Sequence, residues 1–280
     1  MMTIQQLPAA MEFSILMSLY SREMPSSLEC ALKSITSQTL PPREVILVID
    51  GPIGEELESI VQSHLTMLPM KIVRLSRNVG LAAALNEGLK HCSYDLVARF
   101  DTDDWCSPER FEAQCSWMNK HPDVDVLGTW IAEFEVDPHV TSGLRKVPLE
   151  HAQIVRFART RNPMNHMTVM YRKSAVDSAG GYQELDLMED YWLWVRMINN
   201  GYKFANLAQV FVHARAGAGL LERRGGMRYV KSEIKAQRLF LAAGFITFPR
   251  ALYNLVLRVF PRLVPGSVRG ILYRVALRSR

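Results

Sequence analysis

Two groups of carboxylates are the residues of this 280-residue chain whose types and spacing could do chemistry. In the first, Asp101, Asp103 and Asp104 fall within four residues. Carboxylates this close repel one another, so keeping them ionised generally requires a cation. Hard oxygen ligands suit Mg²⁺ or Mn²⁺, and Mg²⁺ is commonly held by one or two carboxylates together with substrate phosphates. The acidic run therefore predicts a metal that joins the protein to a diphosphate.

A structural role is the alternative interpretation of the same run. An aspartate ahead of Ser107-Pro108-Glu109 could act as the N-cap of a following helix. One carboxylate is enough for a cap, and three are present, which favours the metal site. Of the three, Asp104 is the best candidate for a cap or for a group that supports the metal ligands.

The second group is the adjacent pair Glu189 and Asp190, which begins the aromatic segment Tyr191-Trp192-Leu193-Trp194. Acidic residues are favoured in the first turn of a helix by its dipole, so the pair alone fits a helix start as well as it fits catalysis. The catalytic interpretation is a carboxylate that removes a proton from an attacking hydroxyl. A glycosidase also uses two carboxylates but needs no metal cluster, so the close aspartates favour transfer over hydrolysis.

The elements that must position these groups alternate along the first half of the chain. Apolar runs predict buried strands at 13–19, 45–49, 71–75 and 95–100. The intervening segments have helical periodicity, and Ser26 and Glu29 have the Ser-x-x-Glu spacing of a capping box. This order implies an α/β fold whose central sheet is mostly parallel and is covered by helices on both faces.

In such sheets, ligands bind beyond the carboxyl ends of the strands. The rule selects Ser18, Tyr20, Asp50, Arg77, Asn78 and the acidic run. The second half of the chain predicts strands at 124–130 and 166–171 and helices at 111–119 and 191–199. We assign these elements to the same domain, as the part that holds the second substrate.

Composition excludes several other classes of protein. The chain is 48% hydrophobic and 22% charged, which is typical of a globular protein and not of a disordered one. Four cysteines without a CxxC pair suggest neither a zinc site nor a disulfide framework and favour a reduced, cytoplasmic protein. The N-terminal residues do not resemble a signal peptide, and we expect no transmembrane helix.

The net charge of +5 is concentrated near the C-terminus. From Phe248 onward there are seven arginines and no Asp or Glu, whereas the remaining 26 basic and 28 acidic residues balance at −2. Val268, Ile271, Leu272 and Val275 share one apolar face with arginines outside it, a pattern typical of a helix on an anionic membrane surface. The alternatives are a helix packed on the catalytic domain and nucleic-acid binding, and no nucleic-acid-binding motif accompanies the arginines.

Five segments, taken in order, resemble the family 2 glycosyltransferases with the GT-A fold. They are LMSLYSRE, ILVIDG, LSRNVGLAAALNEGL, RFDTDDWCSPERF and MEDYWLWVRMINNGY. Their order and spacing match over residues 12–205. PREVILVIDGP, RNVGLAAALN and NPMNHMTVMYRKS are most similar to bacterial enzymes that build surface polysaccharides, including those of the amylovoran and O-antigen types.

The resemblance implies a domain organisation. A Rossmann-like GT-A domain is expected over 1–225, with its nucleotide-binding half at 12–108 and its acceptor half at 109–225. C-terminal amphipathic helices at 226–280 are expected to form a basic, membrane-associating segment.

The resemblance also implies roles on the donor side. Asp101-Thr102-Asp103 matches the DxD motif, with Asp103 as the metal ligand and Asp101 closer to the donor ribose or diphosphate. Asp50 matches the residue that contacts the uracil of a UDP-sugar, although many relatives carry two acidic residues there and this chain has one. The remaining donor residues fall in two segments, a loop that closes over the nucleotide and a segment along the base and sugar. They are Ser18 and Tyr20 in the first, and Arg77, Asn78 and Gly80 in the second.

On the acceptor side, Asp190 matches the family's catalytic base and Glu189 its orienting neighbour. His166 and Trp192 are candidates for contact with the acceptor sugar, and a packed structural role is the alternative for each. Arg223 and Arg224 lie in a Gly-rich stretch that could order over the donor diphosphate or be an ordinary exposed loop.

These features together predict an inverting glycosyltransferase that depends on Mn²⁺ or Mg²⁺. Its donor would be a nucleotide-sugar, with a UDP-sugar as the expected kind, and its acceptor a glycan linked to a lipid diphosphate at the inner face of the cytoplasmic membrane. The enzyme would transfer a hexose and form a β-linkage. The rival interpretations are a catalytically silent nucleotide- or sugar-binding membrane protein and a nucleotidyltransferase. Retention of Asp101, Asp103 and Asp190 argues against the first, and the second would not account for the Glu189-Asp190 pair.

Overall fold

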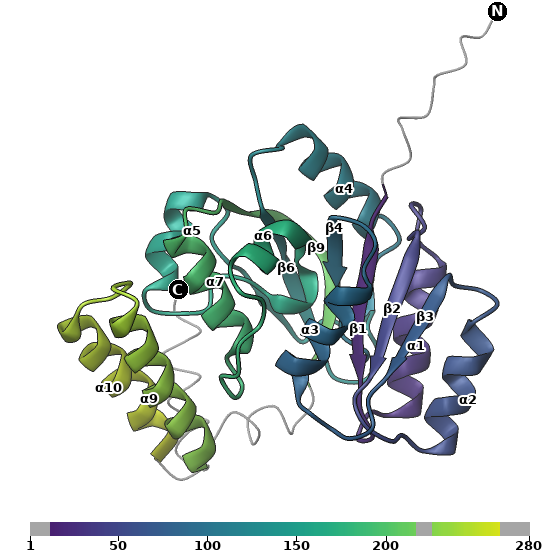
Figure 1. The fold of residues 1–280 in the computed structure, drawn as a ribbon, viewed down its shortest axis with the longest axis horizontal. Helices are drawn as coiled ribbons and strands as arrows, with labels where there is room; N and C mark the ends of the chain where they lie inside the picture. The colour runs from purple at the N-terminus through teal and green to yellow at the C-terminus, as the bar shows by residue number, and fades with distance from the viewer. Residues whose placement is uncertain (1–11, 217–225, 264–280) are drawn as a thin grey trace, which may run out of the picture.

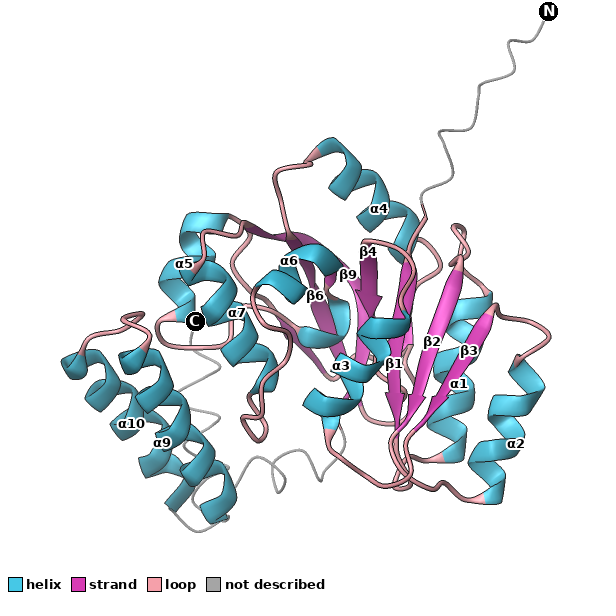
Figure 2. Ribbon diagram, viewed as in Figure 1, coloured by secondary structure: helices cyan, strands magenta, loops and turns pink. Residues whose placement is uncertain are grey.

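The computed structural model describes residues 12–216 and 226–263. In these ranges one mixed sheet contains nine strands in the order β3-β2-β1-β4-β8-β6-β9-β5, with β7 paired to β6. Helices α1, α2 and α4 pack on one face of the sheet, and α3, α6 and α7 pack on the other (Figure 1). The α/β class and the helical layers on both faces are therefore confirmed (Figure 2).

The first half of the sheet is parallel throughout, as the sequence predicts. Its strands are β1 (Ser14–Leu19), β2 (Glu44–Ile49), β3 (Met70–Arg74) and β4 (Leu96–Arg99). The connecting helices are α1 (Pro25–Thr36), α2 (Glu55–His64) and α3 (Leu81–His91). β1 and β2 are buried on both faces, which explains their continuous apolar runs.

Close packing against this half depends on one glycine. A Cβ atom at Gly88 of α3 would overlap with the side chains of Leu16 on β1 and Val48 on β2, the latter at 2.7 Å. The missing side chain therefore lets α3 lie directly on the two strands whose carboxyl ends begin the site loops.

The predicted capping box at the start of α1 is wrong. The helix begins at Pro25, its N-cap is Met24, and no side chain caps it. Proline is favoured in the first helical turn because its backbone dihedral is already set and its missing N–H has no helical partner. Ser26 consequently lies inside the first turn, two positions after the N-cap, and cannot cap the helix.

The second half of the sheet mixes directions. β8 pairs antiparallel with both β4 and β6, whereas β6 and β9 run parallel. The strands are β5 (Trp105–Cys106), β6 (Val126–Phe134), β7 (Gly143–Arg145), β8 (Met170–Arg172) and β9 (Phe204–Arg215). The helices are α4 (Arg110–Lys120), α5 (His151–Ala158), α6 (Lys173–Ser178) and α7 (Glu189–Asn199). The parallel arrangement thus describes the nucleotide half and only part of the second half.

The predicted strand at 166–171 is also wrong in its first part. His166–Thr168 form a short 3-10 helix, and the strand proper begins at Met170. Asn165 causes the turn, because its carbonyl accepts the Thr168 hydroxyl at 2.8 Å and its side chain donates to the carbonyl of Thr129, also at 2.8 Å.

Two further helices form a hairpin beside α7. They are α9 (Gly226–Ala242) and α10 (Phe248–Leu263), and Figure 1 shows them apart from the sheet. Ala236 and Phe240 of α9 share a buried cluster with Tyr191 and Trp192 of α7. The amphipathic segment predicted at 268–275 lies outside the described residues. None of the described helices has the length and hydropathy needed to cross a bilayer.

Candidate active site

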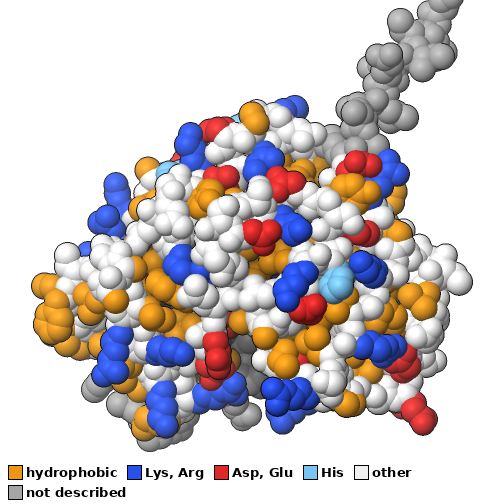
Figure 3. All heavy atoms as spheres, in the orientation of Figure 1, with side chains coloured by type: hydrophobic (Ala, Val, Ile, Leu, Met, Phe, Trp, Pro, Cys, Tyr) orange, Lys and Arg blue, Asp and Glu red, His pale blue; other side chains and the backbone are white. Residues whose placement is uncertain are grey.

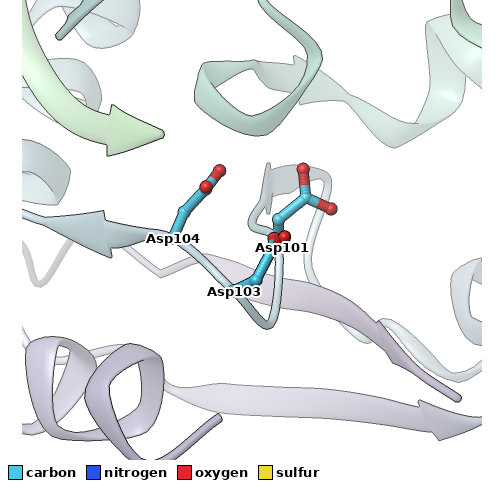
Figure 4. A group of neighbouring side chains, drawn as sticks. All are labelled: Asp101, Asp103 and Asp104. Carbon is cyan, nitrogen blue, oxygen red and sulfur yellow. The ribbon is translucent and has the colours of Figure 1, made fainter. Parts of the chain in front are cut away.

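The acidic run follows β4 and forms a compact group of carboxylates. One oxygen from each of Asp101, Asp103 and Asp104 lies within 4.8 Å of the others. The three side chains point to the same side of their loop (Figure 4). Asp101 pairs with the guanidinium of Arg99, which is only 1% exposed. Burial and the nearby charges of Asp101 and Glu23 raise the pKa of Asp103 to about 7.

Asp104 provides the clearest indication that a cation fits here. It is 3% exposed, and its Oδ1 accepts the backbone N–H of Arg215, at the end of β9, at 2.9 Å. Its Oδ2 is buried without a hydrogen-bond partner among the described residues. Burial and the charges of Asp103 and Asp101 raise its pKa. A divalent cation would satisfy the unpartnered oxygen and offset the repulsion, so the three aspartates suit a metal.

The alternative role of Asp104 as a helix cap is wrong. α4 begins at Arg110, its N-cap is Glu109, and no side chain caps it. The two residues of β5 pair with β9 directly after Asp104. Because of this pairing, Asp104 lies beside β9 and not at the start of α4.

Asp50, at the end of β2, holds the loop that follows β3. Its two carboxylate oxygens accept the backbone N–H groups of Val79 at 2.7 Å and Gly80 at 3.0 Å. The side chain of Asn78 donates to the Asp50 carbonyl at 3.2 Å. A Cβ at Gly51, whose φ is +86°, would lie 2.6 Å from the Asn78 nitrogen, so the two loops touch backbone to backbone. The resemblance predicted donor-binding roles for Asp50, Asn78 and Gly80. The structure adds a positioning role for Asp50, as the acceptor that holds the loop after β3, which the spacing of the residues did not reveal.

The loop after β1 contacts the acidic run. Thr102, the middle residue of the DxD motif, donates its hydroxyl to Glu23 at 2.7 Å and lies 3.5 Å from the carbonyl of Ser18. Tyr20 is 39% exposed at the end of the same strand, and Arg77 is exposed after β3. Glu23 was missed by sequence reasoning, because no pattern pairs it with the aspartates 80 residues later.

The Glu189-Asp190 pair occupies the first turn of α7. Asp190 is 9% exposed, and its Oδ2 accepts a hydrogen bond from the Asn162 side chain at 2.6 Å. Burial raises the pKa of Asp190, against the opposing effect of that hydrogen bond. Burial and the charge of Asp190 raise the pKa of Glu189 to about 7. Leu187, just before the pair, has a φ of +64°, a strained conformation for a residue with a side chain.

Arg99 is the buried cation shared by the two carboxylate groups. Burial raises the pKa values of Asp103, Asp104, Glu189 and Asp190, and the positive charge of Arg99 opposes this at all four. The guanidinium on β4 is therefore within electrostatic reach of both groups. The structure thus brings together carboxylates that lie almost 90 residues apart in the sequence. In the sequence, only the resemblance to family 2 indicated that the two groups belong to one site.

The two candidate acceptor residues are packed among aromatic side chains. His166 shares a 2.9 Å hydrogen bond with the Tyr182 hydroxyl, and burial lowers its pKa. Trp192 is 8% exposed, donates to Gln183 at 2.9 Å and stacks on Phe240 with ring centroids 6.0 Å apart. These contacts favour the packed alternative for both, and contact with an acceptor stays a prediction. Arg223 and Arg224 lie outside the described residues.

A fold of this kind, with an acidic cluster after the fourth strand and a second carboxylate pair at a helix start, is that of a GT-A glycosyltransferase. The sequence profile of glycosyl transferase family 2 matches residues 14–178, more than half of the chain, and the chain belongs to this family. It is therefore a glycosyltransferase, as the sequence resemblance predicted.

Two relatives match over nearly their whole length. The chain is 44% identical to the amylovoran biosynthesis glycosyltransferase AmsE of Erwinia amylovora, covering 93% of this chain and 97% of the relative. It is 40% identical to the UDP-Gal:alpha-D-GlcNAc-diphosphoundecaprenol beta-1,3-galactosyltransferase of Escherichia coli, covering 95% and 97%.

Solved structures agree on the fold. S. aureus TarS 1-349, in complex with UDP-GlcNAc, superposes with a TM-score of 0.66 at 19% identity, over 96% of this chain and 76% of that one. A Pyrobaculum calidifontis mannosyltransferase, PcManGT, in complex with GDP-Man and Mn²⁺, superposes with a TM-score of 0.60 at 17% identity, over 95% and 79%.

Proposed function

We propose that this chain is a metal-dependent inverting glycosyltransferase of bacterial surface polysaccharide biosynthesis. It transfers a hexose from a UDP-sugar to a glycan carried on a lipid diphosphate. The observation that carries the proposal is the presence of two separate carboxylate groups. One has a buried oxygen with no hydrogen-bond partner in the part of the chain that the structure describes, and the other is held by Asn162. A transferase needs one group at the leaving diphosphate and another at the attacking hydroxyl.

The chain's own residues divide the work. Asp103 and Asp101 would hold the divalent cation, with Asp104 beside them, and that cation would offset negative charge on the diphosphate. Asp190, oriented by Asn162, takes the proton of the acceptor hydroxyl. The hydroxyl oxygen then forms a bond to the anomeric carbon, and the bond between that carbon and the diphosphate breaks with its electron pair leaving on the diphosphate. Attack from the opposite face inverts the anomeric carbon and produces a β-linkage.

Burial and Arg99 act on the pKa of the base in opposite directions. Burial favours the protonated form of Asp190, whereas the Arg99 guanidinium favours the ionised form of both Asp190 and Glu189. An Asp190 with a raised pKa is a stronger base than an ordinary aspartate, which suits removal of a proton from a hydroxyl.

The donor and acceptor classes rest on the relatives and on the loop held by Asp50. The Escherichia coli relative is named for a UDP-sugar donor and a diphosphoundecaprenol acceptor. The exposed Tyr20 and Arg77 border the loops that Asp50 and Asn78 organise, where the nucleotide would bind. A lipid-linked acceptor implies that the enzyme works peripherally at the inner face of the cytoplasmic membrane.

One experiment tests this function and its rivals. The full chain is incubated with Mn²⁺ or Mg²⁺, a panel of UDP-sugars and a lipid-diphosphate-linked sugar, and UDP release and product mass are measured. Acceptor-dependent UDP release that requires the metal is expected. Donor binding without release from any sugar would instead support a silent binding protein. Release of pyrophosphate from a nucleoside triphosphate and a sugar phosphate would instead support a nucleotidyltransferase.

A further inference from the structure

One side of α10 presents large apolar side chains to solvent. The exposed fractions range from 53% at Tyr253 to 70% at Phe248. The side chains in question, called the α10 face below, belong to Phe248, Leu252, Tyr253, Val256 and Leu257. Their spacing of four, five, eight and nine residues from the first places them on one side of the helix. Figure 3 shows hydrophobic side chains at this edge of the molecule with Lys and Arg side chains close by.

The opposite side of α10 holds the helix in a fixed rotation. Asn254 is 2% exposed and donates to the carbonyl of Arg159 at 2.9 Å and to the Gln237 side chain at 3.0 Å. Arg258 pairs with the fully buried Glu233 of α9 at 3.0 Å. Turning the α10 face inward would break these buried polar contacts, so its exposure is a property of the fold.

Charge indicates which kind of partner covers the face. From Phe248 to the end of the chain there are seven arginines and no acidic residue, and Arg250 lies exposed beside Tyr253. A second copy of the chain would bring the exposed Arg250 against its own counterpart, since a two-fold interface pairs a surface with itself, and the sequence from Phe248 onward has no carboxylate side chain to pair with that charge. An anionic bilayer supplies negative charge at its headgroups to pair with arginine, and its acyl chains supply an apolar layer to cover the α10 face.

We propose that the α10 face lies in the surface of an anionic lipid bilayer, with its apolar side chains at the headgroup boundary. This surface lies within the segment 226–280 for which the sequence predicted membrane association, but it is separate from the apolar face predicted at 268–275. The proposal rests on the proposed function only for the role of the membrane. Phe240 of α9 contacts Tyr191 and Trp192, the two residues after Asp190, with ring centroids 4.8 and 6.0 Å apart. Docking through α10 therefore sets the position of the candidate base relative to the lipid surface.

Vesicle sedimentation tests the proposal with the full chain. Vesicles of phosphatidylglycerol and phosphatidylcholine are compared with vesicles of phosphatidylcholine alone. The Leu252→Glu/Val256→Glu variant carries two acidic residues on the α10 face. Its matched control, Met67→Glu/Val140→Glu, makes the same change at two side chains that are 55% and 66% exposed elsewhere. A Leu252→Ser/Val256→Ser variant removes apolar area without adding charge, and thermal melts of all variants check folding.

We expect the wild type to bind the anionic vesicles and the first variant to lose on the order of tenfold or more in vesicle affinity. The serine variant should show a smaller loss and the control none. Unchanged binding by both α10 variants would overturn the proposal. The proposal would also be overturned if the wild type were a dimer that became monomeric in these variants while lipid binding persisted. A third contrary result would be loss of vesicle binding when residues 264–280 are deleted, with no effect of the α10 substitutions.

A second readout separates this proposal from the proposed function. Transfer to a short-chain, water-soluble acceptor should proceed equally in the wild type and the Leu252→Glu/Val256→Glu variant. A wild type that binds vesicles but transfers no sugar would refute the function and leave the docking surface intact. A wild type that transfers sugar to the soluble acceptor but ignores anionic vesicles would refute the docking surface alone.

Discussion

Replacing Asp190 with asparagine removes the candidate base while changing little else. The two side chains have nearly the same shape, and one amide oxygen can still accept either the Asn162 side chain or the Tyr191 N–H, which Asp190 now receives at 2.6 and 2.7 Å. The variant thus loses one of these hydrogen bonds and the ability to take a proton. Because burial already disfavours the charged carboxylate, we expect the free energy of unfolding to change by no more than about 1 to 2 kcal/mol.

The expected effect on catalysis is much larger. A positioned general base contributes roughly 10²- to 10⁴-fold to a rate, which corresponds to about 3 to 5.5 kcal/mol in the activation free energy. We therefore expect kcat of the Asp190→Asn variant to fall by that factor. The dissociation constant of the UDP-sugar should stay within about threefold, because in the proposed mechanism Asp190 acts on the acceptor, and its hydrogen bonds go to Asn162 and Tyr191 and not to the nucleotide loops.

The assay measures acceptor-dependent UDP release at saturating donor, together with donor binding by calorimetry. Asp186→Asn is the matched control, since Asp186 lies four residues away and pairs with Arg228 at 2.6 Å on the surface. This control should keep its kcat within about twofold, as expected for a surface ion pair of small energetic weight. If Asp190→Asn transfers sugar at a rate close to wild type, or if Asp186→Asn loses as much, the base is elsewhere.

Four other outcomes are expected. Asn162→Ala should move the acidic limb of the kcat/KM profile to higher pH, because the base must be deprotonated and the hydrogen bond from Asn162 lowers the pKa of Asp190 against the effect of burial; a limb that stays in place between pH 5 and 9 would contradict this. Asp50→Ala leaves two backbone N–H groups without their acceptor, so the unfolding free energy measured in urea should fall by about 2 to 4 kcal/mol and the KM for the donor should rise in initial-rate measurements. An unaltered KM would show that this loop does not bind the donor. Arg258→Met leaves the fully buried charge of Glu233 without its ion-pair partner and should lower the free energy of unfolding, measured with denaturant, by about 3 to 5 kcal/mol. The Glu233→Gln/Arg258→Met double variant should recover most of this loss, and an equal loss in both variants would mean that packing and not charge matters there. Mn²⁺ should raise the Tm of the wild type and leave the Tm of the Asp101→Asn/Asp103→Asn variant unchanged, because metal binding stabilises only a protein that retains the ligands. A similar rise in both proteins would mean that the metal binds outside the acidic cluster.

Sequence reasoning was most successful where a pattern is local. β1, β2 and β4 are buried on both faces, so their apolar runs are visible without knowledge of their neighbours. Parallel strands share the edge at which their carboxyl ends lie, so the positions of Asp50 and the acidic run followed from strand order. The family itself was also recognisable, because its motifs are short and keep their order.

Predictions that depended on distant contacts were incomplete. The two residues of β5 are a strand only because β9 pairs with them. The turn at His166 depends on Asn165 bonding to Thr129, 36 residues away. The cap assigned to Ser26 failed for a local reason, since Pro25 begins the helix earlier.

The sequence by itself determined which carboxylates are present, the order of the strands that carry most of them, and the family to which the chain belongs. The tertiary structure decided how those carboxylates behave. Asn162 donates a hydrogen bond to Asp190, 28 residues later in the sequence, and the backbone N–H of Arg215 donates one to Asp104, 111 residues earlier. Arg99 acts on both groups from the interior. A pKa depends on burial and on neighbouring charges, and both arise only when the chain has folded and brought remote residues together.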